Sequence, residues 1–530
     1  MFSRKLKRQL EQHYGQAPDF MYFDGDLNSI RNYFDHRYIN DLDDFLIDEI
    51  TWNDLSGDRL FKRINHGLST SGEQYLYYLL RCPSITQEEY KKRETLIHIM
   101  EQNPDLRLQL QLILSKLGKR RAANTTEIFA PSDHSPKKLI LYLLLVVTFI
   151  GSMVAAFFST VAVFLLIALF LSIPVYSHIA TNRIEHKLET VNYAVSMVFA
   201  ATRIKKKAFP ELEPHLADFY KTVTTLKKIA RWGHVPSKSA ATEIVLVLNY
   251  LFLFNLILYE ILKSRLGKYQ KEIFEIHEYL GRLDSAIAIA SYRKSLDRYS
   301  IPQLDFSTKN TMFFRGENLV HPLIEQPVPN SLDTTESILL TGSNASGKST
   351  FLKTVALNAI LAQSICTTLA DKYEASAFRI YSSMAITDNL FAGESYFVSE
   401  IKSLRRMTYA NTSEQPLLCV IDEVLRGTNT IERIAASSEL LKHLATEKRL
   451  CFAASHDMEL CAMLSPQYRL FHFEEHITGE GEILFDYTIK DGPARTRNAI
   501  KLMKSLGFDE MLIRQANEKA NVFLADGRWG

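Results

Sequence analysis

The sequence predicts a two-part protein, in which an all-helical N-terminal part carries an apolar hairpin and is followed by an α/β domain. Three observations predict this fold class. Apolar residues recur at i, i+3 and i+4 between charged residues in several N-terminal stretches, which is helical spacing. Residues 139–176 form one long uncharged apolar stretch. Beyond Pro302, short β-rich runs such as Ser337–Leu340 and Leu417–Ile421 alternate with helical stretches, which is typical of a parallel sheet.

The composition limits the function classes. The 530 residues are 46% hydrophobic and have a formal net charge of +2, so the chain can bury large cores and is not a polycation. Any nucleic-acid-binding surface must then be a local basic patch. The five cysteines include no CxxC pair, which argues against a zinc ribbon and fits a reducing compartment. The first 15 residues are basic and polar, and we expect no secretory signal there.

The stretch Leu139–Tyr176 is predicted to enter a membrane. Its 38 residues contain no Asp, Glu, Lys, Arg or His, whereas one crossing takes about 20 apolar residues. The length fits two short spans that reverse near Phe157–Thr160. Basic residues on both sides, among them Lys137, Lys138 and Arg183, place both ends in the cytoplasm. We expect a transmembrane hairpin in the cytoplasmic membrane, with the N-terminus and the C-terminal domain facing the cytoplasm.

The strongest local signal is a strand followed by the pattern GxxxxGK[ST] at Gly342–Ser349, with a helical pattern beginning at Phe351. The glycines let backbone N–H groups wrap phosphates at a helix N-terminus. Lys348 would reach the β- and γ-phosphates of ATP, and the Ser349 hydroxyl would ligate Mg²⁺. The residues expected to bind the nucleotide are Gly342, Ser343, Asn344, Ala345, Ser346, Gly347, Lys348, Ser349 and Thr350.

Two further strand ends supply candidate catalytic residues. The buried-strand run Leu417–Ile421 ends in Asp422 and Glu423, about 70 residues after the phosphate loop. Asp422 can hold Mg²⁺ through water, and Glu423 can polarise an attacking water as general base or orienter. The run Leu450–Ala454 is followed by Ser-His, and His456 could sense the γ-phosphate. A solvated histidine at a strand end is the alternative.

A second apolar run, Ile244–Tyr259, has 16 residues and contains Asn249 and Asn255. A single crossing here would place everything downstream outside the cell. The downstream domain needs cytosolic ATP, so we interpret the run as a buried or membrane-surface helix rather than a third span.

These motifs resemble those of the MutS family of ATPases. The block Asp422–Thr430 is similar to the family's DE-x-x-RGT-x-T sequence, and Thr341–Thr350 resembles its TGPN-x-x-GKST loop, with Ser343 in place of proline. Asp388–Glu400 is similar to the family's S-[TY]-F-x-x-E segment. Two shorter blocks complete the resemblance in family order: Asn318–Leu323, similar to RHP-L, and Ala454–His456, similar to the Thr-His switch.

The resemblance implies a P-loop ATPase domain of the ABC/MutS type that forms a homodimer through the ATPase domains, with ATP and Mg²⁺ as cofactors. In this family the serine that matches Ser395 caps the nucleotide bound to the other subunit. The catalytic candidates are therefore Glu423, Lys348, His456 and Ser395, and the metal ligands are Ser349 and Asp422.

The resemblance extends upstream, where Trp52–Leu55, Ser69–Glu73 and Leu283–Ser291 look like the helical core or lever of the family. The predicted organisation is an N-terminal helical segment at 1–50, a first half of the core or lever at 51–138, the transmembrane hairpin at 139–176, a second half at 177–300 with the apolar helix 244–259, and the MutS-like ATPase domain at 301–530.

The implied function is that of a membrane-anchored, DNA-binding ATPase whose nucleotide state opens and closes a dimeric clamp on double-stranded DNA. No Phe-x-Glu wedge precedes the lever, so the mismatch reader is missing, although a relation to DNA mismatch repair is implied. The basic clusters Arg4–Arg8, Lys116–Arg121 and Arg203–Lys207 could contact phosphates or follow the positive-inside rule. The alternative is a membrane-tethered regulatory or scaffolding ATPase with a protein or lipid partner and no DNA binding. A transporter subunit would need an LSGGQ-type signature, which the chain does not show.

Overall fold

The structure is a computed structural model of the 530-residue chain. It describes residues 2–18, 20–23, 25–40, 45–84, 86–120, 123, 136–226, 243–307, 311–343, 346–384, 396–412, 415–426, 428–446, 448–477, 483–494, 500, 503–504 and 507–526.

The chain folds into two compact units, and neither is continuous in sequence. The helical unit contains Met1–Asp43, Ile64–Leu79 and Arg93–Ser295, and the α/β unit contains Asp44–Arg63, Leu80–Lys92 and Leu296–Gly530. The last division, after Ser295, lies close to the boundary at residue 300 expected from the sequence. The two short N-terminal pieces of the α/β unit differ from the expectation, because the sequence assigned all of their residues to the helical part.

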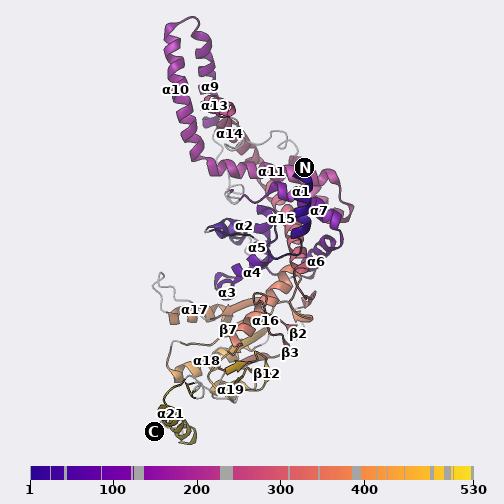
Figure 1. The fold of residues 1–530 in the computed structure, drawn as a ribbon, viewed down its shortest axis with the longest axis vertical. Coiled ribbons are helices and arrows are strands. Elements are labelled where there is room, and N and C mark those ends of the chain that lie inside the picture. The colour runs from indigo at the N-terminus through magenta and orange to yellow at the C-terminus, as the bar shows by residue number, and fades with distance from the viewer. Residues whose placement is uncertain are drawn as a thin grey trace. The chain divides into compact units, whose positions relative to one another are not determined.

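The helical unit consists of helices, two of which form a long hairpin (Figure 1). Its helices are α1 (Phe2–His13), α2 (Asp26–Asn40), most of α5 (Thr70–Arg81), most of α6 (Gln87–Gln102), α7 (Pro104–Leu117), α9 (Lys137–Ala155), α10 (Thr160–Arg183), α11 (Glu185–Lys207), η1 (Pro210–Leu212), α12 (Glu213–Leu226), α13 (Glu243–Leu251), α14 (Phe254–Leu266), η4 (Gly267–Tyr269) and α15 (Gln270–Lys294). Apolar residues recur at helical spacing throughout residues 87–117, which predicts one helix, but the structure has two, α6 and α7. Pro104 begins the second of them, where its missing N–H costs no helical hydrogen bond.

Helices α9 and α10 lie side by side as a hairpin that reverses at residues 156–159, within one residue of the predicted turn (Figure 1). Both are long and apolar enough to cross a membrane, and only 17% and 11% of their most apolar windows are buried in the protein. The expected apolar helix 244–259 is broken into α13 and α14, because Leu253 adopts a left-handed backbone with φ of 53°. Leu253 and Leu256 pack against Phe149 and Ile173 at the hairpin. Among the described residues, α9 and α10 alone are candidate spans.

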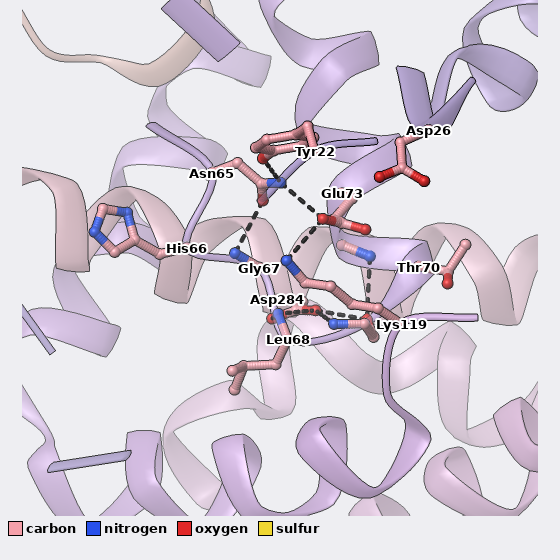
Figure 2. A network of polar contacts seen from close by, with 12 residues as sticks. Tyr22, Asp26, Asn65, His66, Gly67, Leu68, Thr70, Glu73, Lys119 and Asp284 are labelled. Carbon is pink, nitrogen blue, oxygen red and sulfur yellow. Dashed lines mark hydrogen bonds and ion pairs between the residues drawn. The ribbon is translucent and has the colours of Figure 1, made fainter. Parts of the chain in front are cut away.

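A buried polar network joins α5 and α15 in the helical unit (Figure 2). Asp284 of α15 accepts hydrogen bonds from the Ser69 amide at 2.8 Å and from the Ser69 hydroxyl at 2.5 Å. Lys119 forms an ion pair of 2.7 Å with Glu73 of α5. Burial raises the pKa of Asp284 to about 6, although the bonds from Ser69 and Leu68 and the charge of Lys119 oppose the shift. The structure therefore brings together Ser69–Glu73 and Leu283–Ser291, two of the three upstream segments that resemble the helical core or lever.

The α/β unit holds a six-stranded sheet in the order β12-β9-β4-β8-β7-β6, parallel except for the edge strand β12. Its strands are β4 (Ser337–Thr341), β6 (Arg379–Ser383), β7 (Leu417–Asp422), β8 (Arg449–Ala454), β9 (Tyr468–His472) and β12 (Lys490–Asp491), and its helices are α16 (Lys348–Ile365), α17 (Tyr396–Thr408), α18 (Thr430–Leu444), α19 (Glu459–Leu464) and α21 (Glu510–Asp526). The central strands β4, β7 and β8 have the positions and parallel pairing that the sequence predicts.

A second sheet in this unit has the order β1-β5-β2-β3 and was not expected from the sequence. It contains β1 (Gln303–Asp305), β2 (Phe314–Leu319), β3 (Asn330–Thr334) and β5 (Lys372–Ser376), and a two-stranded ribbon adds β10 (Glu475–Ile477) and β11 (Ile483–Phe485). The N-terminal helices α3 (Glu49–Asp54) and α4 (Gly57–Ile64) belong mainly to this unit. The Ser382 hydroxyl donates to Asp54 Oδ2 at 2.7 Å, which attaches α3 to β6.

Candidate nucleotide-binding site

The loop between β4 and α16 is shaped by two glycines. Gly342 has φ of 135° and Gly347 has φ of 113°, and both values lie in the region that side chains rarely adopt. A Cβ on Gly342 would lie 2.4 Å from the Phe473 carbonyl oxygen, so only glycine fits there. The loop consequently turns sharply into the N-terminus of α16, where free backbone N–H groups and the helix dipole attract anions.

Lys348 is buried at the start of α16. Its ammonium donates to the carbonyl oxygens of Gly342 at 2.8 Å and Ser343 at 2.7 Å. Burial lowers the pKa of Lys348 to about 8, although the carboxylates of Asp422, Glu423 and Glu475 oppose the shift. The site therefore holds a cation whose charge is costly unless an anion lies nearby.

Asp422 is the last residue of β7, and Glu423 follows it with a left-handed backbone of φ 60°. Glu423 Oε1 lies 2.5 Å from His456 Nε2, and Glu423 Oε2 lies 2.5 Å from Arg426 Nε. Burial alone would raise the pKa of Glu423, but the bond from His456 and the charges of Arg426 and Lys348 outweigh it and hold the pKa below its usual value. Glu423 is thus an ionised carboxylate whose two oxygens are oriented from two sides.

One cavity of about 790 Å³ connects these residues. Its polar part is lined by Ser343, Ser346, Gly347, Lys348, Ser349, Thr350, Asp422, Glu423 and Arg426, and its other walls are Leu319, His321, Ile324, Gln326, Pro327, Val328, Asn330, Phe351, Thr354, Phe473 and Tyr487. A cavity of this size, lined by both charged and apolar side chains, suits a small molecule with a phosphate chain and an aromatic ring.

His321, which lines the cavity, is a neutral histidine with a defined orientation. The Leu323 amide donates to His321 Nδ1 at 3.1 Å, so the neutral ring carries its proton on Nε2. Burial, and secondarily the charge of Lys353, lower the pKa of His321 to about 4. The Asn358 side chain of α16 donates to the Val320 carbonyl oxygen at 3.0 Å and holds this strand end against the helix.

The residues at the polar end fit MgATP. Ser346 Oγ is buried and has no hydrogen-bond partner among the described residues, which suits a loop that surrounds phosphate oxygens. Ser349 and Asp422 offer the hydroxyl and carboxylate oxygens that Mg²⁺ prefers. No group of three His, Cys, Asp or Glu side chains that could hold a metal occurs in the described part of the chain. Mg²⁺ at such sites is typically held by one or two carboxylates together with the substrate's phosphates.

Most of the residues predicted from the sequence meet at this cavity. His456 does not line it, but contacts Glu423 directly. Asn344, Ala345 and Ser395 lie outside the described residues. Arg426 lies within the motif Asp422–Thr430, but the motif predicts no role for it. The cavity walls Phe473 and Tyr487 belong to no local motif and were not predicted.

A glycine-shaped phosphate loop after a central strand, with an acidic pair at the end of a second strand in the same sheet, defines a P-loop nucleotide-binding domain. The comparisons with known proteins give its family. Residues 338–523 match the MutS domain V family, which is the ATPase domain of MutS proteins.

Three similar proteins have the same name. The DNA mismatch repair protein MutS of Pseudothermotoga lettingae is 31% identical over 264 residues, which are 47% of this chain and 31% of that protein. The MutS proteins of Geobacillus thermodenitrificans (29% over 275 residues, 49% of this chain and 29% of that protein) and of a Thermus thermophilus strain (30% over 201 residues, 37% and 24%) are also similar. The chain covers about a third or less of the length of these curated relatives. The match therefore lies in the C-terminal part of the chain, where residues 338–523 are similar to the ATPase domain of MutS proteins.

Proposed function

We propose that this chain is a Mg²⁺-dependent ATPase. The observation that carries the proposal is the position of Lys348, Asp422 and Glu423 around one cavity at the carboxyl ends of parallel strands. This is where ligands bind in open α/β sheets. The match of residues 338–523 to MutS domain V supports the same reaction class.

In this proposal each residue has one task. The loop amides and Lys348 bind the phosphate chain, and Ser349 with Asp422 holds Mg²⁺. When bound, Mg²⁺ neutralises charge on the phosphate oxygens. Glu423 accepts a hydrogen bond from the attacking water and fixes its direction, since a carboxylate oxygen can accept two bonds and each oxygen has one protein partner. The low pKa of Glu423 makes it a weak base, so it serves chiefly to orient the water.

The apolar end of the cavity would receive the base. Ile324, Val328 and Tyr487 offer apolar and aromatic surface, and His321 and Asn330 are the polar groups beside them. The Asn330 side chain is already engaged, because it donates to the Tyr487 carbonyl oxygen at 3.0 Å and accepts from the Ile489 amide at 2.8 Å. His321 is therefore the side chain at this end whose ring proton can contact the base.

The hairpin is proposed to anchor the protein in the cytoplasmic membrane, with the N-terminus and the ATPase domain facing the cytoplasm. Large apolar side chains of α9, α10 and the turn between them are exposed, including Phe157 (87%), Phe158 (86%) and Phe164 (75%). A soluble protein rarely exposes so continuous an apolar surface. Lys137 and Lys138 before the hairpin and Arg183 at its end support the cytoplasmic orientation.

Double-stranded DNA is the proposed macromolecular ligand, and a homodimer through the ATPase domains is the proposed assembly. Support comes from the family, because the relatives are named DNA mismatch repair proteins. In this proposal ATP binding and hydrolysis open and close the paired helical parts on DNA.

The test is the ATPase rate of the detergent-purified full chain, with and without duplex DNA, at low and physiological salt. We expect DNA to change the rate and the effect to fade with salt, since phosphate contacts release counterions. Hydrolysis that depends on Glu423 but ignores DNA would instead support the alternative, a membrane-tethered regulatory ATPase with a protein or lipid partner.

A further inference from the structure

Glu400 is a buried carboxylate that the proposed mechanism does not use. It lies on α17, is 4% exposed, and has no contact with the nucleotide cavity. Its Oε1 accepts a hydrogen bond from the Leu425 amide at 2.5 Å. Burial raises the pKa of Glu400, while the amides of Leu425 and Arg426 and the charge of Arg426 oppose that shift. A buried charged group of this kind is costly to keep, so its position calls for a physical reason.

The loop that Glu400 contacts is strained. Glu423 has φ of 60° and Leu425 has φ of 57°, and neither residue is glycine. Such conformations are unfavourable for residues with a side chain and persist only where the surroundings hold them. The loop runs directly from the end of β7, so the backbone at these residues determines where the Glu423 carboxylate points.

Arg426 and His456 each lie 2.5 Å from the Glu423 carboxylate, and three hydrogen bonds hold the backbone of residues 423–425 in the described part of the chain. The Glu423 amide donates to the Ala454 carbonyl oxygen at 3.0 Å, which fixes the beginning of the loop to β8. The Ser437 hydroxyl donates to the Val424 carbonyl oxygen at 3.4 Å, which is a long bond. The charge-assisted bond to Glu400 is the shortest of the three, and it acts on the second strained residue.

Helix α17 is itself fixed at its other end. Arg406 forms an ion pair with Asp48 and donates to the Thr51 hydroxyl at 3.0 Å, so the helix is tied to α3. Leu404 and Met407 are buried in the same core as Val424 and Leu425. The helix can therefore hold the Glu400 carboxylate at a defined place beneath the loop.

We infer that Glu400 is a positioning residue for hydrolysis: by holding the Leu425 amide, it maintains the strained loop that aims Glu423 at the attacking water. This inference rests on the proposed ATPase function. Any displacement of α17 would move the Glu423 loop, so this helix couples its own position to the rate of ATP hydrolysis.

The test compares Glu400→Ala, which removes the acceptor, with Glu400→Gln, which keeps a neutral acceptor, in the full-length protein. Glu400→Met removes the acceptor while filling the space, and replaces the alanine variant should that variant fail to fold. Arg405→Ala, on the exposed side of the same helix, is the matched control. The two readouts are ATPase kinetics and hydrogen exchange of the peptide that contains Leu425.

We expect Glu400→Ala to lower kcat by at least tenfold with KM within twofold of wild type, and to speed exchange of the Leu425 amide by about tenfold. Glu400→Gln should stay within threefold of wild type on both readouts, and Arg405→Ala should match wild type. Unchanged exchange at Leu425 in both acceptor-free variants would overturn the inference, whatever the ATPase rate. A fall in both kcat and thermal stability together with a rise in KM would also overturn the inference, because this combination indicates general unfolding. If wild type itself hydrolyses no ATP, the proposed function fails, and the exchange readout alone decides whether Glu400 holds the loop.

Discussion

Glu423 and Arg426, three residues apart in the same loop, form an ion pair with 2.5 Å between Glu423 Oε2 and Arg426 Nε. The other oxygen of Glu423 contacts His456 from the neighbouring strand end. The proposed catalytic carboxylate is therefore oriented by one residue of its own loop and one that follows β8. Both partners favour the ionised form, which explains why its pKa is lowered although burial raises it.

The first prediction concerns the charge of this carboxylate. Glu423→Gln should lower kcat by about 100-fold or more, because the neutral amide orients and polarises water poorly. Nucleotide affinity should stay within threefold of wild type, since the phosphates are bound by the loop and Lys348. Steady-state kinetics and equilibrium binding of a fluorescent ATP analogue measure the two quantities. A variant that hydrolyses ATP at the wild-type rate would remove Glu423 from the mechanism.

The second prediction is a pH dependence of nucleotide binding. The pKa of Lys348 is lowered to about 8, so the side chain loses its proton as pH rises through 8, well below the usual value for lysine. Phosphates bind the charged form, and ATP affinity should therefore decline from pH 7 to pH 9.5. Folding stability changes with pH in the opposite direction to ATP affinity. The unfolded chain binds more protons than the folded one between about pH 8 and 10.5, so this residue adds stability as pH rises there.

Binding titrations of the ATP analogue across this pH range check the second prediction, with Lys348→Arg as the control. The guanidinium keeps its charge throughout, so the affinity of this variant should not change with pH, even if it is weaker than that of wild type. A pH profile of the same shape in both proteins would assign the effect to another group.

The third prediction tests the packing of the buried network in the helical unit. A Cβ at Gly72 would lie 2.1 Å from Asp284 Oδ2, so Gly72→Ala should force the network apart and destabilise the protein by about 1 to 3 kcal/mol. Gly151→Ala is the matched control, because nothing lies within 4 Å of the added methyl group. Thermal unfolding of the two variants in the same detergent gives the comparison. Equal unfolding midpoints for Gly72→Ala and Gly151→Ala would show that the network accommodates the added methyl group without loss of stability.

The fourth prediction concerns the hairpin. Replacing residues 139–176 by a short polar loop should move the protein from the membrane fraction to the soluble fraction, because the exposed apolar side chains are then gone. The nucleotide site lies in the other unit, so ATP affinity should stay within twofold. Fractionation of cells that express either form makes the measurement. A hairpin-free protein that still sediments with membranes would place the anchor elsewhere.

Local signals made part of this structure predictable. The strand, loop and helix around Gly342–Ser349 and the acidic pair after β7 are contiguous motifs, and the structure places their described residues around one cavity. The second sheet gave no such signal, because strands such as Gln303–Asp305 and Asn330–Thr334 are short and rich in polar residues. The cavity walls come from segments up to about 170 residues apart in sequence. The hydrogen bond between Asp54 and Ser382 is equally non-local, and no sequence pattern around Asp54 predicts it.

The interleaved chain path also sets an order of events during synthesis. Ser69 cannot meet Asp284, and Asp54 cannot meet Ser382, until the ribosome has made the later residue of each pair. The apolar helices α9 and α10 end at Arg183, about 100 residues before Asp284. At about 5 to 20 residues per second, they leave the ribosome about 5 to 20 seconds before the helical unit can close. The hairpin has therefore left the ribosome before Ser69 and its neighbours can form their hydrogen bonds with Asp284.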